Sequence, residues 1–242
     1  MKQQLFCLTL CIAVCIALST VASARAQERS AALDDPYFGV ELALGFAGTV
    51  DLEAGSVRLG GTTVTASSDF DDSDYDADVA IGGAIRYLRP LHRYFALGVR
   101  IGIQTWRSDS DADTGRNIAF DLSLIPQGRV PVSRTVELYL SIPVGLTFDL
   151  LNEIDASVNF PALMTGASVS ADPGFGWNLA FMFGSRFAVS PDVGLFAELG
   201  YALHQVSHDI NFRSEVGGVA GTIVVDLDVM WSQVALNAGV TF

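Results

Sequence analysis

The sequence predicts an all-β fold, an eight-stranded antiparallel up-and-down transmembrane β-barrel. Half of the residues are apolar, yet after the N-terminal leader there is no continuous apolar run long enough to cross a membrane as a helix. Eight segments instead alternate apolar residues with small or polar ones. Only helices and closed barrels satisfy every backbone polar group in lipid, so this combination indicates a barrel.

The first 26 residues have the pattern of a secretory signal peptide. Lys2 precedes an apolar run from Leu5 to Ala22, and Ala24-Arg25-Ala26 has the small-x-small form that signal peptidase accepts. We therefore expect a signal peptide over residues 1–26 and a barrel domain over residues 27–242. An uncleaved membrane anchor is the alternative, because the run is close to spanning length.

Cleavage would change the chemistry of the chain. It removes all three cysteines, so the mature chain would hold neither disulfides nor thiolate metal sites. It also removes Lys2 and Arg25, which changes the formal net charge from −13 to −15. Such an acidic chain is repelled by phosphates, so nucleic acid is not an expected partner.

Residues 38–47 form the first predicted strand. Apolar residues take every second position, and the positions between them hold glycine, alanine or Glu41. Neighbouring side chains on a strand point to opposite faces, so one face suits lipid and the other suits a lumen. The same alternation predicts seven more strands. They cover residues 79–87, 95–104, 118–129, 137–149, 177–187, 194–204 and 233–242.

Proline interrupts the fourth and fifth predicted strands, at Pro126 and Pro143. Because proline cannot donate to a ladder, each is expected at an edge or a bulge. The connections offer an independent test, since barrels of this type alternate short turns with long loops. The breaks near residues 89–93, 131–135 and 190–192 are short and those between them are long, with both chain ends on the side of the short turns.

Two glycine pairs predict hairpin tips beyond the membrane. With Gly217-Gly218 at a tip, Val193 faces Phe242, Tyr201 faces Val234 and Phe212 faces Ile223. In both arms the apolar residues then change parity, between residues 203 and 210 and between 225 and 234, which predicts bulges there. Gly60-Gly61 similarly places Val57 opposite Val64.

The end of the chain carries the sharpest motif. Val240 and the terminal Phe242 resemble the C-terminal signal of the outer-membrane β-barrel superfamily, which includes the transmembrane domain of outer-membrane protein A. The glycine usual in that signal is replaced by Asn237, and Gly239 follows two residues later.

The resemblance covers nearly all of the mature chain. It implies a monomer in the outer membrane of a Gram-negative bacterium, with the short turns in the periplasm. Because nothing follows Phe242, we do not expect the peptidoglycan-binding domain that some relatives append. Its implied partners are outer-membrane lipid, the barrel-assembly machinery and periplasmic chaperones.

Charged residues on the inward faces form a predicted lumen charge network. If the turn is centred at Ser133, Arg129 lies opposite Glu137, and Arg186 lies diagonal to Glu198. Such pairs would plug a lumen that is only wide enough for side chains, or would act as a gate that exchanges partners. The network comprises Glu41, Arg86, Arg100, Asp121, Arg129, Glu137, Asp149, Arg186 and Glu198.

Two other parts of the sequence could carry a site. The aspartates between residues 69 and 78, and those at 109, 111 and 113, could hold calcium, but the second run lacks the glycine spacing and closing glutamate of an EF-hand. Solvated outer loops are the alternative. Small barrels with lipid A deacylase activity carry a histidine two residues before a serine. Here His204 precedes Ser207 by three, so His204 inside and His208 in the loop are expected to be polar fillers.

The sequence thus predicts a non-enzymatic outer-membrane barrel without cofactor or metal, with a structural role in the envelope or a surface-contact role. The alternative is a narrow or gated channel for small solutes, including apolar ones that enter through the wall. Outward aromatic residues near both ends of the strands are expected to form girdles that fix the depth in the bilayer.

Overall fold

The structure is a computed structural model that describes residues 35–59, 62–65, 75–77, 79–106, 117–151, 168–216 and 219–242. Within these ranges no helix has the length and apolarity needed to cross a membrane. The predicted signal peptide lies outside them. The strands are β1 (Tyr37–Leu59), β2 (Thr62–Thr65), β3 (Tyr75–Ala77), β4 (Ala80–His92), β5 (Phe95–Trp106), β6 (Asn117–Pro131), β7 (Val136–Ser141), β8 (Val144–Leu150), β9 (Ser168–Ala171), β10 (Gly174–Ala188), β11 (Gly194–Val216) and β12 (Val219–Thr241).

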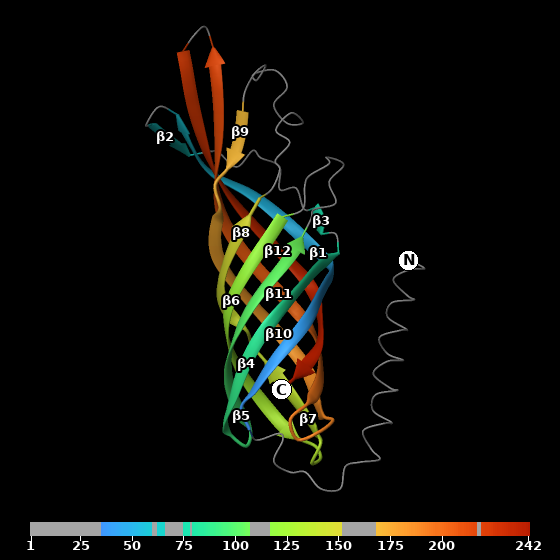
Figure 1. Cartoon of the computed structure of the whole chain (residues 1–242). Helices are drawn as coiled ribbons and strands as arrows, with labels where there is room; N and C mark the ends of the chain where they lie inside the picture. Colours follow the sequence, from blue (N-terminus) through green and yellow to red (C-terminus); the bar gives the residue numbers. More distant parts are fainter. Residues whose placement is uncertain are drawn as a thin grey trace, which may run out of the picture.

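Antiparallel pairing closes these strands into a ring of eight (Figure 1). The order around the ring is β1, β4, β5, β6, β7 with β8, β10, β11 and β12, and β12 pairs with β1. β7 and β8 count as one strand, because both pair with β6 and β10 in the same register. The eight-stranded up-and-down barrel is confirmed.

The two prolines lie on neighbouring strands and weaken the ladder only locally. Pro143 divides β7 from β8, and the N–H of Ile142 donates to the carbonyl of Pro126 at 3.0 Å. On the other side, the N–H of Ala180 donates to the carbonyl of Pro143 at 2.8 Å. The neighbouring strands therefore stay in register through the break.

The long hairpin of β11 and β12 confirms the predicted register. Tyr201 pairs with Val234 and Phe212 with Ile223, and the ladder runs unbroken from Gly194 to Val216. The predicted bulges in these two strands are therefore wrong. The apolar parity changes because the lumen itself becomes apolar toward the outer end of the barrel, where Val206 and Val229 point inward.

The bulges lie in β1 instead. Its pairing with β12 shifts between Phe46 and Thr49 and again between Ala54 and Val57. Ala47 has a φ of 50°, which a residue with a Cβ adopts at a cost, and which is typical of a bulge. Beyond this bulge the inward parity changes, so that Val50 is buried in the lumen.

Three strands continue well past the barrel. β1, β11 and β12 each have 23 residues, whereas a strand crosses a bilayer in about 9–11. The extensions pair with β2 and β9, and together they stand above one end of the barrel (Figure 1). Val57 pairs with Val64 as predicted. At the opposite end lie the short turns and the C-terminus.

The outer face of the barrel is an apolar belt. Large apolar side chains alternate outward along every strand of the ring, and many are 40–64% exposed in the isolated chain. Near the short turns the rings of Phe38 and Tyr87 lie 4.9 Å apart, at the position predicted for one aromatic girdle. An exposed belt of this extent requires an apolar surrounding such as lipid.

Candidate functional site

The lumen is the candidate site, because the barrel brings together there side chains that are far apart in the sequence. The structure places all nine residues of the lumen charge network inside the barrel. Eight of them are buried, and the Arg100 side chain is 17% exposed. Because a buried charge is costly unless it is paired, these groups are expected to compensate one another.

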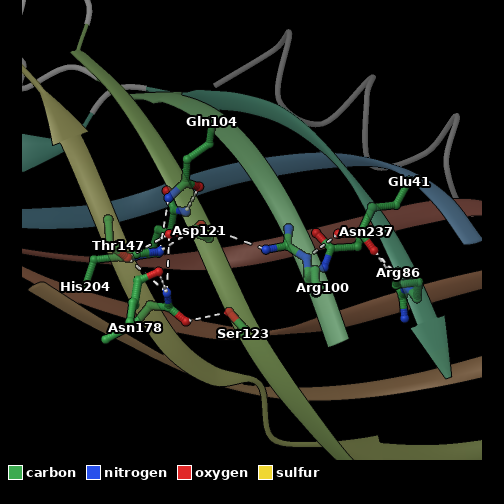
Figure 2. A network of polar contacts seen from close by, with 12 residues as sticks. Glu41, Arg86, Arg100, Gln104, Asp121, Ser123, Thr147, Asn178, His204 and Asn237 are labelled. Carbon is green, nitrogen blue, oxygen red and sulfur yellow. Dashed lines mark hydrogen bonds and ion pairs between the residues drawn. The ribbon is translucent and has the colours of Figure 1, made fainter. Parts of the chain in front are cut away.

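Arg86 on β4 bridges two carboxylates across the lumen (Figure 2). Its Nε donates to Glu41 Oε2 at 2.9 Å, and its Nη2 makes a further contact with the same oxygen. Nη1 and Nη2 donate to the two oxygens of Glu198 at 2.6 and 3.0 Å. Asn237 adds a hydrogen bond to Glu198 at 3.2 Å. Because β4 and β11 are three steps apart around the ring, this bridge crosses the lumen.

Arg100 extends the bridge toward the outer end. Its Nε donates to Glu41 Oε1 at 2.6 Å, and its Nη1 lies 3.8 Å from Asp121 Oδ2. Asp121 accepts a hydrogen bond from Thr147 at 2.7 Å and lies 3.4 Å from the Nε2 of His204. Together with the Arg86 bridge, this chain of polar contacts joins β1, β4, β5, β6, β8, β11 and β12 (Figure 2).

The predicted register of the turn after β6 is wrong by two residues. Glu137 pairs with Pro131 rather than with Arg129, because the turn is centred at Arg134. Ser133 fixes that turn, since its Oγ accepts the N–H groups of the two residues that follow Arg134. Arg129 still reaches Glu137 diagonally, with 2.9 Å between Nε and Oε2.

Arg186 occupies a different environment from its expected partner. It lies diagonal to Glu198 in the ladder, as predicted, but Glu198 binds Arg86. On its other side Arg186 pairs across the strands with Glu137, and its guanidinium carbon lies 4.0 Å from the centre of the Tyr37 ring.

The outer part of the lumen holds an aromatic stack that the sequence did not predict. Trp106 and Trp231 stack with 4.9 Å between ring centroids, and His204 stacks on the other face of Trp231 at 4.5 Å. The change of apolar parity in β11 and β12 was the signal that could have found this stack. The two tryptophans belong to an apolar cluster, whose other members are Val50, Ala80, Ala119, Val206 and Val229.

His208 is the second histidine of the lumen, not a loop residue as predicted. It lies on β11 with its side chain fully buried, and its Nε2 lies 3.2 Å from Asp149 Oδ2. Asp149 also accepts a hydrogen bond from Trp106 Nε1 at 3.1 Å. The Asp149 carboxylate, the last charge of the network, is thus contacted by ring nitrogens of Trp106 and His208.

Little free space remains between these groups. The cavity in the middle of the lumen has a volume of about 50 Å³. Since one water molecule needs on the order of 10–15 Å³ on this measure, the cavity holds only a few. The Arg86 bridge lies on one side of this cavity, and the aromatic stack lies on the other.

A larger hollow of about 530 Å³ lies at the outer end, on the outside of β11 and β12. Asp209, Asp226 and Asp228 line it, and Arg58 from β1 contacts Asp226 at 2.5 Å and Asp209 at 3.5 Å. The hydrogen bond with Asp226 raises the pKa of Asp209 above its ordinary value, although nearby Arg58 opposes this shift. The hollow is thus lined by acidic side chains, two of which pair with the guanidinium of Arg58.

The other predicted sites are separated or lie elsewhere. His204 points inward, whereas Ser207 lies on the outer face and donates to Asp228, so the two cannot act on one substrate atom. The aspartates proposed for calcium lie outside the residues whose side chains are described. Among those described, no group of three or more histidines, cysteines or carboxylates is arranged to hold a metal ion.

The proposed assembly motif lies at the end with the short turns. Val240 pairs with Val40 on one side and with Leu195 on the other. Phe242 is 61% exposed, and its backbone exchanges two hydrogen bonds with Phe38. The last residues therefore close the barrel seam between β12 and β1.

Comparison with known proteins shows the class of fold. The chain is similar to the outer membrane protein OprG from Pseudomonas aeruginosa, with a TM-score of 0.51 and 12% identity over 86% of this chain and 96% of that one. The chain therefore has the fold of the small outer-membrane β-barrels.

Two further structures are more distant. The outer membrane protein AlkL matches with a TM-score of 0.40 and 12% identity over 85% of this chain and 90% of AlkL. Neisserial surface protein A matches with a TM-score of 0.37 and 11% identity over 81% of this chain and 96% of that protein. No family model matches the sequence, and no curated protein matches it.

Proposed function

We propose that this chain is a closed outer-membrane barrel that acts without catalysis, through its wall and its outer strands, as a structural or surface-contact protein of the envelope. The observation that carries the proposal is the Arg86 bridge to Glu41 and Glu198, which crosses the lumen and is almost fully buried. A second barrier, the stack of Trp106 on Trp231, lies toward the outer end. Ions that enter from either side would meet a packed barrier.

The surface-contact role is supported by the strands that extend beyond the barrel. About half of β11 and of β12 lies beyond the length that a bilayer requires. Ordered pairing continues there, and the acidic side chains of Asp209, Asp226 and Asp228 face outward. This extension offers a rigid, negatively charged surface to the outside of the cell.

Conductance in planar bilayers tests the closed lumen. The refolded wild-type protein should give no current steps above background. A variant that combines Arg86→Ala with Trp231→Ala removes both barriers and should give steps, which serves as the positive control. Reproducible ion-selective steps from the wild type would reject the closed barrel and establish instead the narrow channel that is the alternative prediction.

Export and assembly are part of the same proposal. The signal peptide over residues 1–26 should be removed, so the mature protein should begin at Gln27 when it is isolated from outer membranes. Val240 and Phe242 are proposed to bind the barrel-assembly machinery. Deletion of Phe242 should reduce the amount of folded barrel in the outer membrane without preventing refolding in detergent; equal amounts in cells would reject that role.

A further inference from the structure

The short-turn end of the barrel carries three exposed arginines at two neighbouring turns. Arg89 lies near the end of β4, Arg93 lies in the turn between β4 and β5, and Arg134 lies in the turn between β6 and β7. The turns are adjacent, because β5 pairs with β6 and the N–H of Arg129 donates to the carbonyl of Tyr94 at 3.0 Å. We call these three arginines the basic rim.

No carboxylate lies within either segment to neutralise the basic rim. Residues 87–99 and 128–136 contain no aspartate or glutamate, and the next acid, Glu137, is buried in the lumen. Of the two exposed acids at the same end, Asp192 precedes β11, on another part of the ring, whereas Asp35 precedes β1, which pairs with β4. The basic rim is thus a local positive surface on a chain whose formal net charge is −13.

The basic rim also joins the apolar belt without a break. Leu91, Tyr94, Val130 and Val132 are 57%, 52%, 57% and 60% exposed, and they lie on or beside the same two turns. Guanidinium groups next to apolar and aromatic side chains fit the boundary of a bilayer, where stems stay in apolar surroundings and charged heads reach the phosphates. The boundary of a bilayer matches both the arginines and the apolar side chains beside them.

We propose that the basic rim binds the phosphate headgroups of anionic phospholipids in the leaflet at the short-turn end, and so fixes the depth and orientation of the barrel. The inference rests on the membrane location proposed above. Arginine suits this ligand because its planar fork can make paired hydrogen bonds to phosphate oxygens. A basic residue near an anionic surface contributes about 1 kcal/mol, or about fivefold in affinity, so three give roughly a hundredfold.

The test is a titration of the full-length mature protein, refolded in dodecylphosphocholine micelles, with dihexanoyl phosphatidylglycerol. The side-chain N–H signals of the arginines are followed by NMR, and dihexanoyl phosphatidylcholine serves as the zwitterionic comparison. The wild type should bind phosphatidylglycerol roughly a hundredfold more tightly than a variant with Arg89→Gln, Arg93→Gln and Arg134→Gln. Arg58→Gln, which removes an arginine at the other end, should leave the affinity unchanged.

Several outcomes would overturn the inference. They are equal affinity of the triple variant and the wild type, equal affinity for the two lipids, and equally tight binding of inorganic phosphate or of soluble peptidoglycan fragments. Heat-modified migration on electrophoresis shows whether each variant has folded. A wild type that does not fold in micelles or bilayers would reject the proposed membrane function, whereas a folded barrel without lipid preference would reject only the basic rim.

Discussion

Replacing Arg86 with methionine tests whether charge compensation holds the lumen together. The Arg86 side chain is 3% exposed, and its two carboxylate partners, Glu41 and Glu198, are 0% and 4% exposed. Without the guanidinium, Glu41 would keep its contact with Arg100, whereas Glu198 would face the lumen beside the neutral amide of Asn237. Removing one partner of a buried ion pair costs about 3–5 kcal/mol, and we expect this loss in the free energy of unfolding.

The assay is urea unfolding of the refolded barrel in phosphatidylcholine vesicles, followed by circular dichroism. Arg89→Met is the matched control, because Arg89 lies on the same strand but is exposed, and such changes usually stay within about 0.5 kcal/mol. Adding Glu198→Gln to Arg86→Met should restore most of the loss, since it removes the uncompensated charge. The reasoning would be refuted by a single variant as stable as the control, or by a double variant no more stable than the single one.

Three further substitutions probe other parts of the barrel. Trp231→Ala should lower the free energy of unfolding by about 3–5 kcal/mol, because it empties the most buried ring of the apolar cluster; a change below about 1 kcal/mol in urea unfolding would contradict this. Gly184→Ala would place a Cβ 2.6 Å from the Tyr139 ring and should cost about 1–3 kcal/mol, so an unchanged urea midpoint would count against it. The carboxyl carbon of Asp209 should titrate by NMR above pH 3.8, because the hydrogen bond with Asp226 raises its pKa. Folding therefore favours the protonated form of Asp209. This stabilisation is present below the ordinary pKa and is lost as the pH rises through the raised pKa. Asp209→Asn should abolish this pH dependence, and a titration midpoint at or below 3.8 would contradict the raised pKa.

The strands and their faces could be predicted because they depend on local pattern. Period-two alternation gave the ring of eight, and a glycine pair gave the full register of β11 with β12. The turn after β6 was predicted wrongly because the hydroxyl of Ser133 binds backbone N–H groups and moves the centre to Arg134. The centre of a turn can move by one residue because of single hydrogen bonds such as these. The alternation of apolar residues does not encode them.

The contents of the lumen were less predictable, because they depend on which strands face one another across it. Parity placed the acids and bases inward, but it could not identify partners across the lumen, such as Arg86 for Glu198. The stack of Trp106 on Trp231 joins strands three steps apart around the ring. Both tryptophans lie just outside the segments whose alternation predicted the strands. Parity alone also does not show whether an inward side chain lies in a polar or an apolar part of the lumen.

The bulge at Ala47 explains how one strand serves both halves of the molecule. Within the membrane β1 directs Glu41 into the charge network, and the residues between face lipid. If the same parity continued, Val50 would point outward above the bilayer and Asp51 would point into the apolar cluster. The extra residue opposite β12 reverses the parity, so Val50 is buried in the cluster and Asp51 lies on the outer side. In β11 and β12 no reversal is needed, because there the inward residues themselves change from polar to apolar. The backbone strain at Ala47 therefore lies at the level where a charged lumen gives way to an apolar one, and its cost is offset by keeping a carboxylate out of that cluster.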